Sequence, residues 1–206
     1  MDREDSWQAI ATMRRGLADL LDQLTDQEWE TASLCAGWRV RDVAAHVALA
    51  PQVPGVGTML ADAVRAGGRF HRLNHDLAVR HAGARPPARL VEELREHAAS
   101  RRLPAVTNYR NIVLDVAVHG QDVAIPLGLD FAVPREAAIA AAMRAWTMGW
   151  PFWARRRLRG LRLVATDADW TAGEGEAVHG PIDALLLLLT GRAAAAAPRL
   201  TGPVPR

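Results

Sequence analysis

The sequence predicts a mainly α-helical protein, in which a helical bundle is followed by a small extension of mixed α and β structure. Throughout residues 1–158, apolar side chains recur at the three- and four-residue spacing of amphipathic helices. Beyond them, Leu161–Ala165 alternates as a strand does. We therefore expect a helical bundle over 1–158, a β-hairpin with a helix over 159–192, and a flexible tail over 193–206.

Capping signals mark where the expected helices begin. Asp5 or Ser6 can cap a first helix that runs to about Leu24. Thr25 and Glu28 form a capping box, in which each residue's side chain satisfies a backbone donor of the other, and this predicts a short helix after Thr25. Further helices, separated by proline, glycine or polar residues, are expected at about 39–50, 56–66, 69–81, 87–101, 108–125, 134–149 and 151–158.

The extension combines a predicted hairpin with one last helix. We expect Leu161–Ala165 to pair with an antiparallel strand at Glu176–His179, because glycines punctuate this region. Pro181 should open the last helix and Gly191 should end it. The alanine- and proline-rich tail that follows has no polar face to shape a helix, so we expect it to lie along the surface or to be disordered.

The composition argues against nucleic acids and membranes as partners. All 25 basic residues are arginine, but 23 acidic residues are mixed among them and the net charge is only +2. The one basic run, Arg155–Arg157 with Arg159 and Arg162, is therefore a weak sign of nucleic-acid binding. No apolar stretch approaches the roughly 18 residues of a membrane span, and the N-terminus does not resemble a secretion signal. We expect a cytoplasmic monomer or homodimer.

Any metal ion in this chain would be held by histidine and carboxylate side chains, because Cys35 is the only cysteine. Asp115 and His119 lie four residues apart in the helix expected at 108–125, and this spacing stacks them on one face. Burying a carboxylate and an imidazole among apolar neighbours is costly unless a partner such as a cation compensates. Asp115 and His119 are therefore candidate ligands of a divalent metal.

His46 is the natural third ligand, and Asp122 is a candidate supporting residue. His46 interrupts the otherwise apolar surface of the helix expected at 39–50. Three ligands of the histidine and carboxylate type leave a coordination position open to water or substrate, as catalytic sites require. Asp122 lies one turn after His119, where it could accept the ring N–H of a ligand histidine.

The same residues also have plainer interpretations. A histidine in a core is usually only hydrogen-bonded, and an aspartate and a histidine four residues apart often form an ion pair. His71 and His75 repeat the four-residue spacing, but their polar surroundings favour a solvated helix face. Cys35 lies just before a helix, where a thiolate is favoured, yet a structural role is the more common one for such a residue.

Three segments of local sequence surround these residues. The first segment is LTDQEW, followed by CAGWRVRDVAAH, which ends at His46. The second is LDVAVHGQDV, which carries Asp115 and His119. A third, weaker segment begins with Ala165–Trp170 and closes with LLTGR, which ends at Arg192. Together these segments resemble the mycothiol-dependent maleylpyruvate isomerase family, which belongs to the DinB-like four-helix metalloenzymes. They follow the family's order and cover most of the chain.

The resemblance assigns roles to several residues. It implies that His46 and His119 match the family's two metal-binding histidines and that Asp115 matches the carboxylate ligand. The isomerase itself is expected to carry glutamate at the position of Asp115. The shorter side chain implies looser ligation, a bridging water, or ligation by Asp122 instead. Arg192 matches an arginine that handles the anionic substrate, or it only lies at a solvated helix end.

The resemblance also implies a chemistry. It implies a divalent metal, zinc in the first place and nickel or another ion as alternatives, with mycothiol or a related thiol as cofactor or co-substrate. The metal would favour the thiolate, which would attack an electrophilic substrate. Release of the thiol after bond rotation would give cis–trans isomerisation, and loss of a leaving group would give S-transfer. The alternative is a non-catalytic metal-binding or partner-binding module that kept the metal site.

Overall fold

The computed structural model describes most of the chain, in three stretches. These are residues 1–52, 70–103 and 107–205, apart from the side chains of Phe70 and His71. The helix expected at 56–66 lies outside the described residues. The chain divides into two compact units, which we call the helical unit and the mixed unit. The helical unit comprises Ile10–Tyr109 and His119–Ala132, and the mixed unit comprises Met1–Ala9, Arg110–Val118 and Val133–Arg206.

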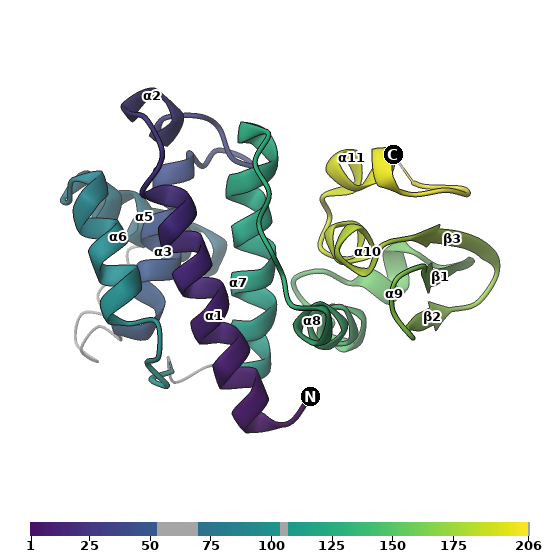
Figure 1. Ribbon diagram of the computed structural model, residues 1–206. Coiled ribbons are helices and arrows are strands. Elements are labelled where there is room, and N and C mark those ends of the chain that lie inside the picture. Colours follow the sequence, from purple (N-terminus) through teal and green to yellow (C-terminus); the bar gives the residue numbers. More distant parts are fainter. Residues whose placement is uncertain (53–69, 104–106, 206) are drawn as a thin grey trace. The chain divides into compact units, whose positions relative to one another are not determined.

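The helices of the helical unit are α1 (Arg3–Leu21), α2 (Asp26–Trp29), α3 (Val40–Leu49), α5 (Phe70–Gly83), α6 (Pro87–Glu96) and α7 (Tyr109–Ala124), with the short 3-10 helices η1 (Ala50–Gln52) and η2 (Ile125–Leu127). Most of them lie close to the positions expected from the sequence, but α6 ends at Glu96 and not near Arg101, and α1 ends at Leu21 and not at Leu24. Both α1 and α7 also contribute residues to the mixed unit. Helix α3 packs against α5 and α6 (Figure 1), and most of its side chains are buried. The helix that carries His46 is therefore part of the core of this unit.

The two capping predictions had different outcomes. The capping box is confirmed, because the Thr25 N–H donates to Glu28 Oε2 at 2.8 Å and the Glu28 N–H donates to Thr25 Oγ1 at 3.4 Å. The first helix instead begins earlier than expected, because the Asp2 carboxylate accepts the Asp5 N–H at 2.9 Å. Asp5 and Ser6 lie inside this helix, so the prediction that one of them caps it was wrong.

The mixed unit combines helices with a small sheet (Figure 1). Its elements, besides parts of α1 and α7, are α8 (Arg135–Thr147), α9 (Ala154–Arg157), β1 (Leu161–Ala165), β2 (Thr171–Gly173), β3 (Glu176–Gly180), α10 (Ile182–Leu189), α11 (Ala193–Ala196) and the 3-10 helix η3 (Ala197–Arg199). Helix α10 packs against α8, and every residue of α10 except Asp183 is buried. Its leucine run therefore forms core. Within the described ranges, no helix has the length and apolar character needed to cross a bilayer.

The sheet has the strand order β2-β1-β3, and the predicted antiparallel pairing of Glu176–His179 with β1 was wrong. The antiparallel partner of β1 is β2, whereas β3 pairs parallel with β1 and places Val178 beside Leu163. The connection from β2 to β3 passes the start of β1, where Gly175 lies against the carbonyl of Gly160 with a φ of +115°. A Cβ at Gly175 would overlap that oxygen, so only glycine allows this passage.

The last residues differ from the flexible tail expected from their composition. They form α11 and η3, and Thr201 then makes an antiparallel bridge with His179 of β3. Leu200 is only 8% exposed and fills the space that the absent side chain of Gly180 leaves. The contacts that order this segment come from β3, and for that reason the alanine-rich sequence gave no sign of them.

A buried acid joins α6 to its neighbours in the helical unit. The Glu93 side chain is 3% exposed, and its carboxylate lies 2.6 Å from His81 Nε2, 2.9 Å from Gln52 Nε2 and 2.6 Å from Arg85 Nε. Burial alone would raise the pKa of Glu93, but hydrogen bonds from these three side chains outweigh burial and hold the pKa below its ordinary value. The surroundings of Glu93 in the folded chain therefore favour its charged form.

We expect Glu93→Gln to lower the free energy of unfolding by about 2 kcal/mol at neutral pH, because three donors lose a charged acceptor. Denaturant titration measures this. Glu92→Gln is the matched control, since Glu92 pairs with Arg89 on an exposed face, and it should cost less than about 0.5 kcal/mol.

The same variant should also change the response to acid. Because the pKa of Glu93 is lower in the native than in the unfolded chain, its contribution is present above pH 4.5 and is lost as the pH falls through the native pKa. Glu93→Gln should therefore lose less stability than the wild type on acidification. Equal losses in the two proteins would contradict this role for Glu93.

Candidate metal site

Four of the predicted site residues lie on two helices. His46 lies on α3, whereas Asp115, His119 and Asp122 lie along α7. One ligand atom each from His46, Asp115 and His119 lies within 4.8 Å of the other two. All three residues are partly exposed. The structure thus brings together the three side chains that the sequence singled out as a candidate ligand set.

The two imidazoles of this group are in direct contact. The rings of His46 and His119 meet edge to face, with centroids 5.0 Å apart and planes at 76°. Trp38 packs against His46 in the same manner, with centroids 5.7 Å apart, and so limits the movement of the His46 ring. His75 touches the same indole at 5.6 Å, but no cluster of potential ligands in the described part of the chain includes it. Of the pair formed by His71 and His75, His75 thus lies near the site, and the side chain of His71 lies outside the described residues.

Asp122 orients His119 from inside the protein. Its carboxylate is fully buried, and Oδ2 lies 2.9 Å from His119 Nδ1. The Cys35 thiol donates to the same oxygen at 3.0 Å, and its sulfur lies 3.7 Å from His119 Nδ1. Cys35, His119 and Asp122 form a second group of potential ligands, but these atoms already bind one another. An imidazole whose Nδ1 binds a carboxylate presents Nε2 to a metal.

The loop between α2 and α3 brings Cys35 to α7. An antiparallel bridge closes this loop, and its turn contains Gly37 with a φ of +80°, which glycine adopts without strain. The Leu34 N–H donates to the backbone carbonyl of Asp122 at 3.1 Å. This backbone hydrogen bond fixes the loop on α7, so the adjacent Cys35 thiol reaches the Asp122 carboxylate.

Charged residues fix the start of α3. The Asp42 carboxylate accepts the Arg39 N–H at 2.9 Å and binds the Arg39 guanidinium through both oxygens, each at 2.9 Å. Glu30 joins this cluster through ion pairs with Arg39 and Arg41 at 2.7 and 2.6 Å. Hydrogen bonding to Asp42, assisted by Glu30, raises the pKa of Arg39 above its ordinary value. The first turn of α3 is thereby anchored, and His46 lies further along the same helix.

The glycine that follows His119 has a structural role. The ring of Phe131 occupies the space where a Cβ of Gly120 would lie. Residue 120 must therefore be glycine for this ring to pack directly against α7. The chain segment after α7 is in this way held against the helix beside the candidate ligand.

Arg192 lies apart from the residues of the His46 cluster in the sequence, and its surroundings are those of a helix end. Arg192 follows α10 in the mixed unit, where its Nη1 donates to the Thr190 carbonyl at 2.8 Å, and its role in substrate binding stays a prediction. Sequence reasoning missed the contact of Cys35 with Asp122, because these residues are 87 positions apart. The one available signal was that each lies within a segment that resembles the family.

We expect Asp122→Ala to lower the free energy of unfolding by about 2 kcal/mol, because the Cys35 thiol and the His119 ring lose a buried acceptor. Denaturant titration measures the change. Asp130→Ala, on the exposed segment after α7, is the control and should change the stability by less than about 0.5 kcal/mol. If both variants were equally stable, the contacts of Asp122 with Cys35 and His119 would not stabilise the fold.

Comparisons with known proteins place the chain in a family. Residues 10–124 match the family model described as "Mycothiol maleylpyruvate isomerase N-terminal domain". The fold resembles a crystal structure of mycothiol-dependent maleylpyruvate isomerase, with a TM-score of 0.63 and 15% sequence identity over 100% of this chain and 97% of that chain. A crystal structure of a histidine-to-alanine mutant of mycothiol-dependent maleylpyruvate isomerase matches with a TM-score of 0.62, at the same identity and coverage.

No curated protein is significantly similar to this sequence. The structural likeness confirms the predicted fold class, a mainly α, DinB-like bundle with a small α and β extension. The family model matches more than half of the chain. The chain therefore belongs to the family of the mycothiol maleylpyruvate isomerase N-terminal domain.

Proposed function

We propose that this chain is a metal-dependent enzyme that uses a small thiol, mycothiol or a close relative, to isomerise or to modify an electrophilic substrate. The observation that carries the proposal is the group formed by His46, Asp115 and His119, whose ligand atoms lie within 4.8 Å of one another. Family membership supports the choice of thiol, since the family's description joins mycothiol to an isomerase.

In this proposal His46, Asp115 and His119 hold one divalent ion. Nδ1 of His119 lies 2.9 Å from Asp122, so Nε2 is the nitrogen that it would offer to the ion. The same contact favours Asp115 over Asp122 as the carboxylate ligand, because Asp122 is fully buried and also binds the Cys35 thiol at 3.0 Å. Two imidazoles and one carboxylate suit zinc, with nickel or another divalent ion as alternatives.

A divalent ion held by three protein ligands keeps one coordination position open and lowers the pKa of a thiol that occupies it. The chain's own residues prepare this arrangement. Asp122 holds the proton at Nδ1 of His119 and so fixes the tautomer and the direction of the ring. Trp38 packs edge-on against His46 and fixes the second imidazole. Both ligand rings are thus oriented before anything binds.

Attack of a thiolate on an electrophilic carbon accounts for both activities under consideration. If the thiol is expelled again after rotation about a weakened double bond, the result is isomerisation. If another group leaves, the result is S-transfer. We propose Arg192, at the end of α10, as the cation that pairs with a carboxylate of the thiol or the substrate. A thiol cofactor has to stay reduced, which favours a cytoplasmic location.

We expect the protein reconstituted with zinc to hold one ion per chain, and His46→Ala and His119→Ala to lose it, because each substitution removes one of three ligands. Elemental analysis after dialysis measures the stoichiometry. His75→Ala is the matched control, since His75 touches Trp38 but belongs to no ligand cluster in the described ranges. His71→Ala should also keep the ion. Loss of the ion from His75→Ala or His71→Ala alone would refute the proposed ligand set.

Activity is tested by conjugation of mycothiol, glutathione or cysteine to a chlorodinitrobenzene electrophile, with and without zinc. The rate should exceed the uncatalysed rate with at least one thiol, should depend on zinc, and should return to the uncatalysed rate in His119→Ala. A protein that binds zinc stoichiometrically but accelerates none of these reactions would contradict S-transfer and would favour a non-catalytic metal-binding module.

A further inference from the structure

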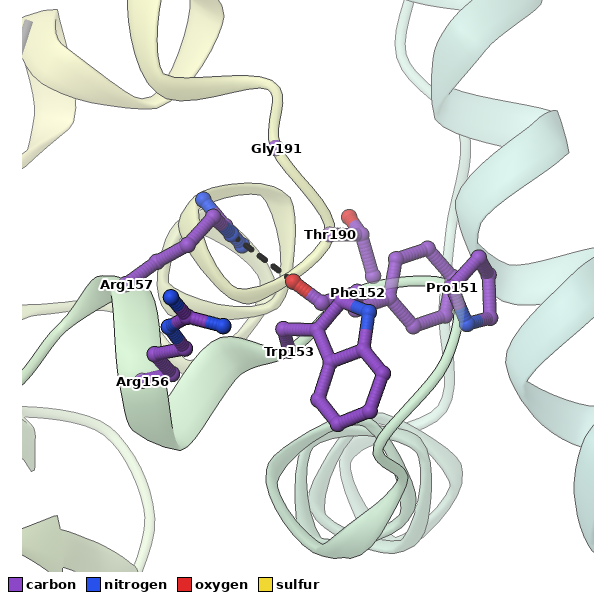
Figure 2. Close-up of a pocket in the computed structure, with 7 residues that line it drawn as sticks. All are labelled: Pro151, Phe152, Trp153, Arg156, Arg157, Thr190 and Gly191. Carbon is purple, nitrogen blue, oxygen red and sulfur yellow. Dashed lines mark hydrogen bonds between the residues drawn. The ribbon is translucent and has the colours of Figure 1, made fainter.

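A pocket of about 640 Å³ lies in the mixed unit, where α9 begins and α10 ends (Figure 2). It is lined by the loop Pro151–Trp153, by Arg156 and Arg157 of α9, and by Thr190 and Gly191. A volume of this size is in the range of small-molecule sites. The pocket combines an apolar wall with two cationic side chains, and this combination indicates what it could bind.

Trp153 is held in an unfavourable backbone conformation that leaves its indole exposed. Its φ of 49° and ψ of 36° lie in the left-handed region, and no other non-glycine residue within the described stretches has a positive φ. The backbone N–H of Trp153 donates to the Gly149 carbonyl at 2.7 Å. The indole lies against Gly149, which has no side chain to displace it. The residue is nevertheless 53% exposed. Strained residues of this kind gather at functional sites, and core packing does not account for an exposed ring.

Arg157 lines the pocket, and its guanidinium binds backbone carbonyls. Its Nε donates to the Phe152 carbonyl at 2.8 Å, and its Nη2 donates to the Leu189 carbonyl at 2.8 Å (Figure 2 shows the first of these bonds). These bonds tie the loop before α9 to the end of α10, so both walls of the pocket are fixed. Burial lowers the pKa of Arg157, which reflects the cost of keeping a cation there.

Arg156 provides the accessible cation. In the part of the chain that the structure describes, its side chain makes no ion pair and no hydrogen bond. No acidic residue occurs in the sequence from Met148 to Arg162, so this stretch of chain carries only positive side chains. Figure 2 shows Arg156 and Trp153 together at the pocket. An anionic group with an apolar body would satisfy both of them.

We propose that this pocket binds a small aromatic carboxylate, with its ring against Trp153 and its carboxylate against Arg156. The aromatic and proline side chains of the loop match a flat apolar body, and a guanidinium matches a carboxylate in both charge and shape. This inference goes beyond the proposed function, because it requires neither a metal ion nor a thiol.

The test is isothermal titration of the full-length protein with naphthoate and with its neutral amide, naphthamide. Naphthoate should bind at least about fivefold more tightly, because only the anion pairs with Arg156. Arg156→Gln should abolish this preference and leave the affinity for naphthamide unchanged. Trp153→Leu should weaken the binding of both compounds, because it removes the flat ring. Thermal melts of each variant establish that it is folded.

Arg159→Gln is the matched control, since Arg159 belongs to the same basic run but does not line the pocket. It should bind naphthoate as the wild type does. Equal losses in Arg156→Gln and Arg159→Gln would mean diffuse attraction to the basic run and would overturn the proposal. Loss of binding in His46→Ala would place the ligand at the metal cluster and would also overturn it. If naphthoate failed to bind a wild-type protein that is loaded with zinc and active, the proposed ligand of this pocket would be wrong, whereas the proposed metal-dependent function would stand.

Discussion

The hydrogen bond between His119 and Asp122 is the constraint on which the candidate site depends. It joins Nδ1 of an imidazole to a fully buried carboxylate at 2.9 Å, and a buried carboxylate without such partners would be costly. The bond determines which nitrogen of His119 can bind a metal. It also distinguishes the two aspartates of α7, because Asp122 is fully buried against the ring, whereas Asp115 is partly exposed and belongs to the cluster with His46.

The surrounding helical unit holds this bond in place through one short loop. Two neighbouring residues of the loop contact Asp122, since the Leu34 N–H binds its carbonyl and the Cys35 thiol binds its carboxylate. The same loop leads directly into α3, where Asp42 anchors the first turn. The position of His46 on α3 and the orientation of the ring of His119 on α7 therefore depend on the same segment. The contact of the two rings, with centroids 5.0 Å apart, follows from this.

Local sequence signals predicted most of the fold, and the failures at the sheet and at Cys35 have a common cause. Apolar spacing located α3 and α7, and the four-residue spacing placed Asp115 and His119 on one face. Spacing alone could not pair α3 with α7. That His46 joins them was indicated by its place in an otherwise apolar helix surface and by the resemblance to a family. The parallel pairing of β3 depends on the close approach of Gly175 to Gly160, and the bond of Cys35 spans 87 positions. Neither leaves a local pattern, because both arise only when distant segments meet.

The central claim is that His46, Asp115 and His119 converge on one cation, with Nδ1 of His119 reserved for Asp122. Anomalous diffraction from crystals loaded with zinc tests it most directly. The claim predicts a single anomalous peak at about 2.0–2.2 Å from Nε2 of His119, from a nitrogen of His46 and from an oxygen of Asp115. A peak bonded to the Cys35 sulfur or to Nδ1 of His119, or the absence of any peak beside His46, would contradict it.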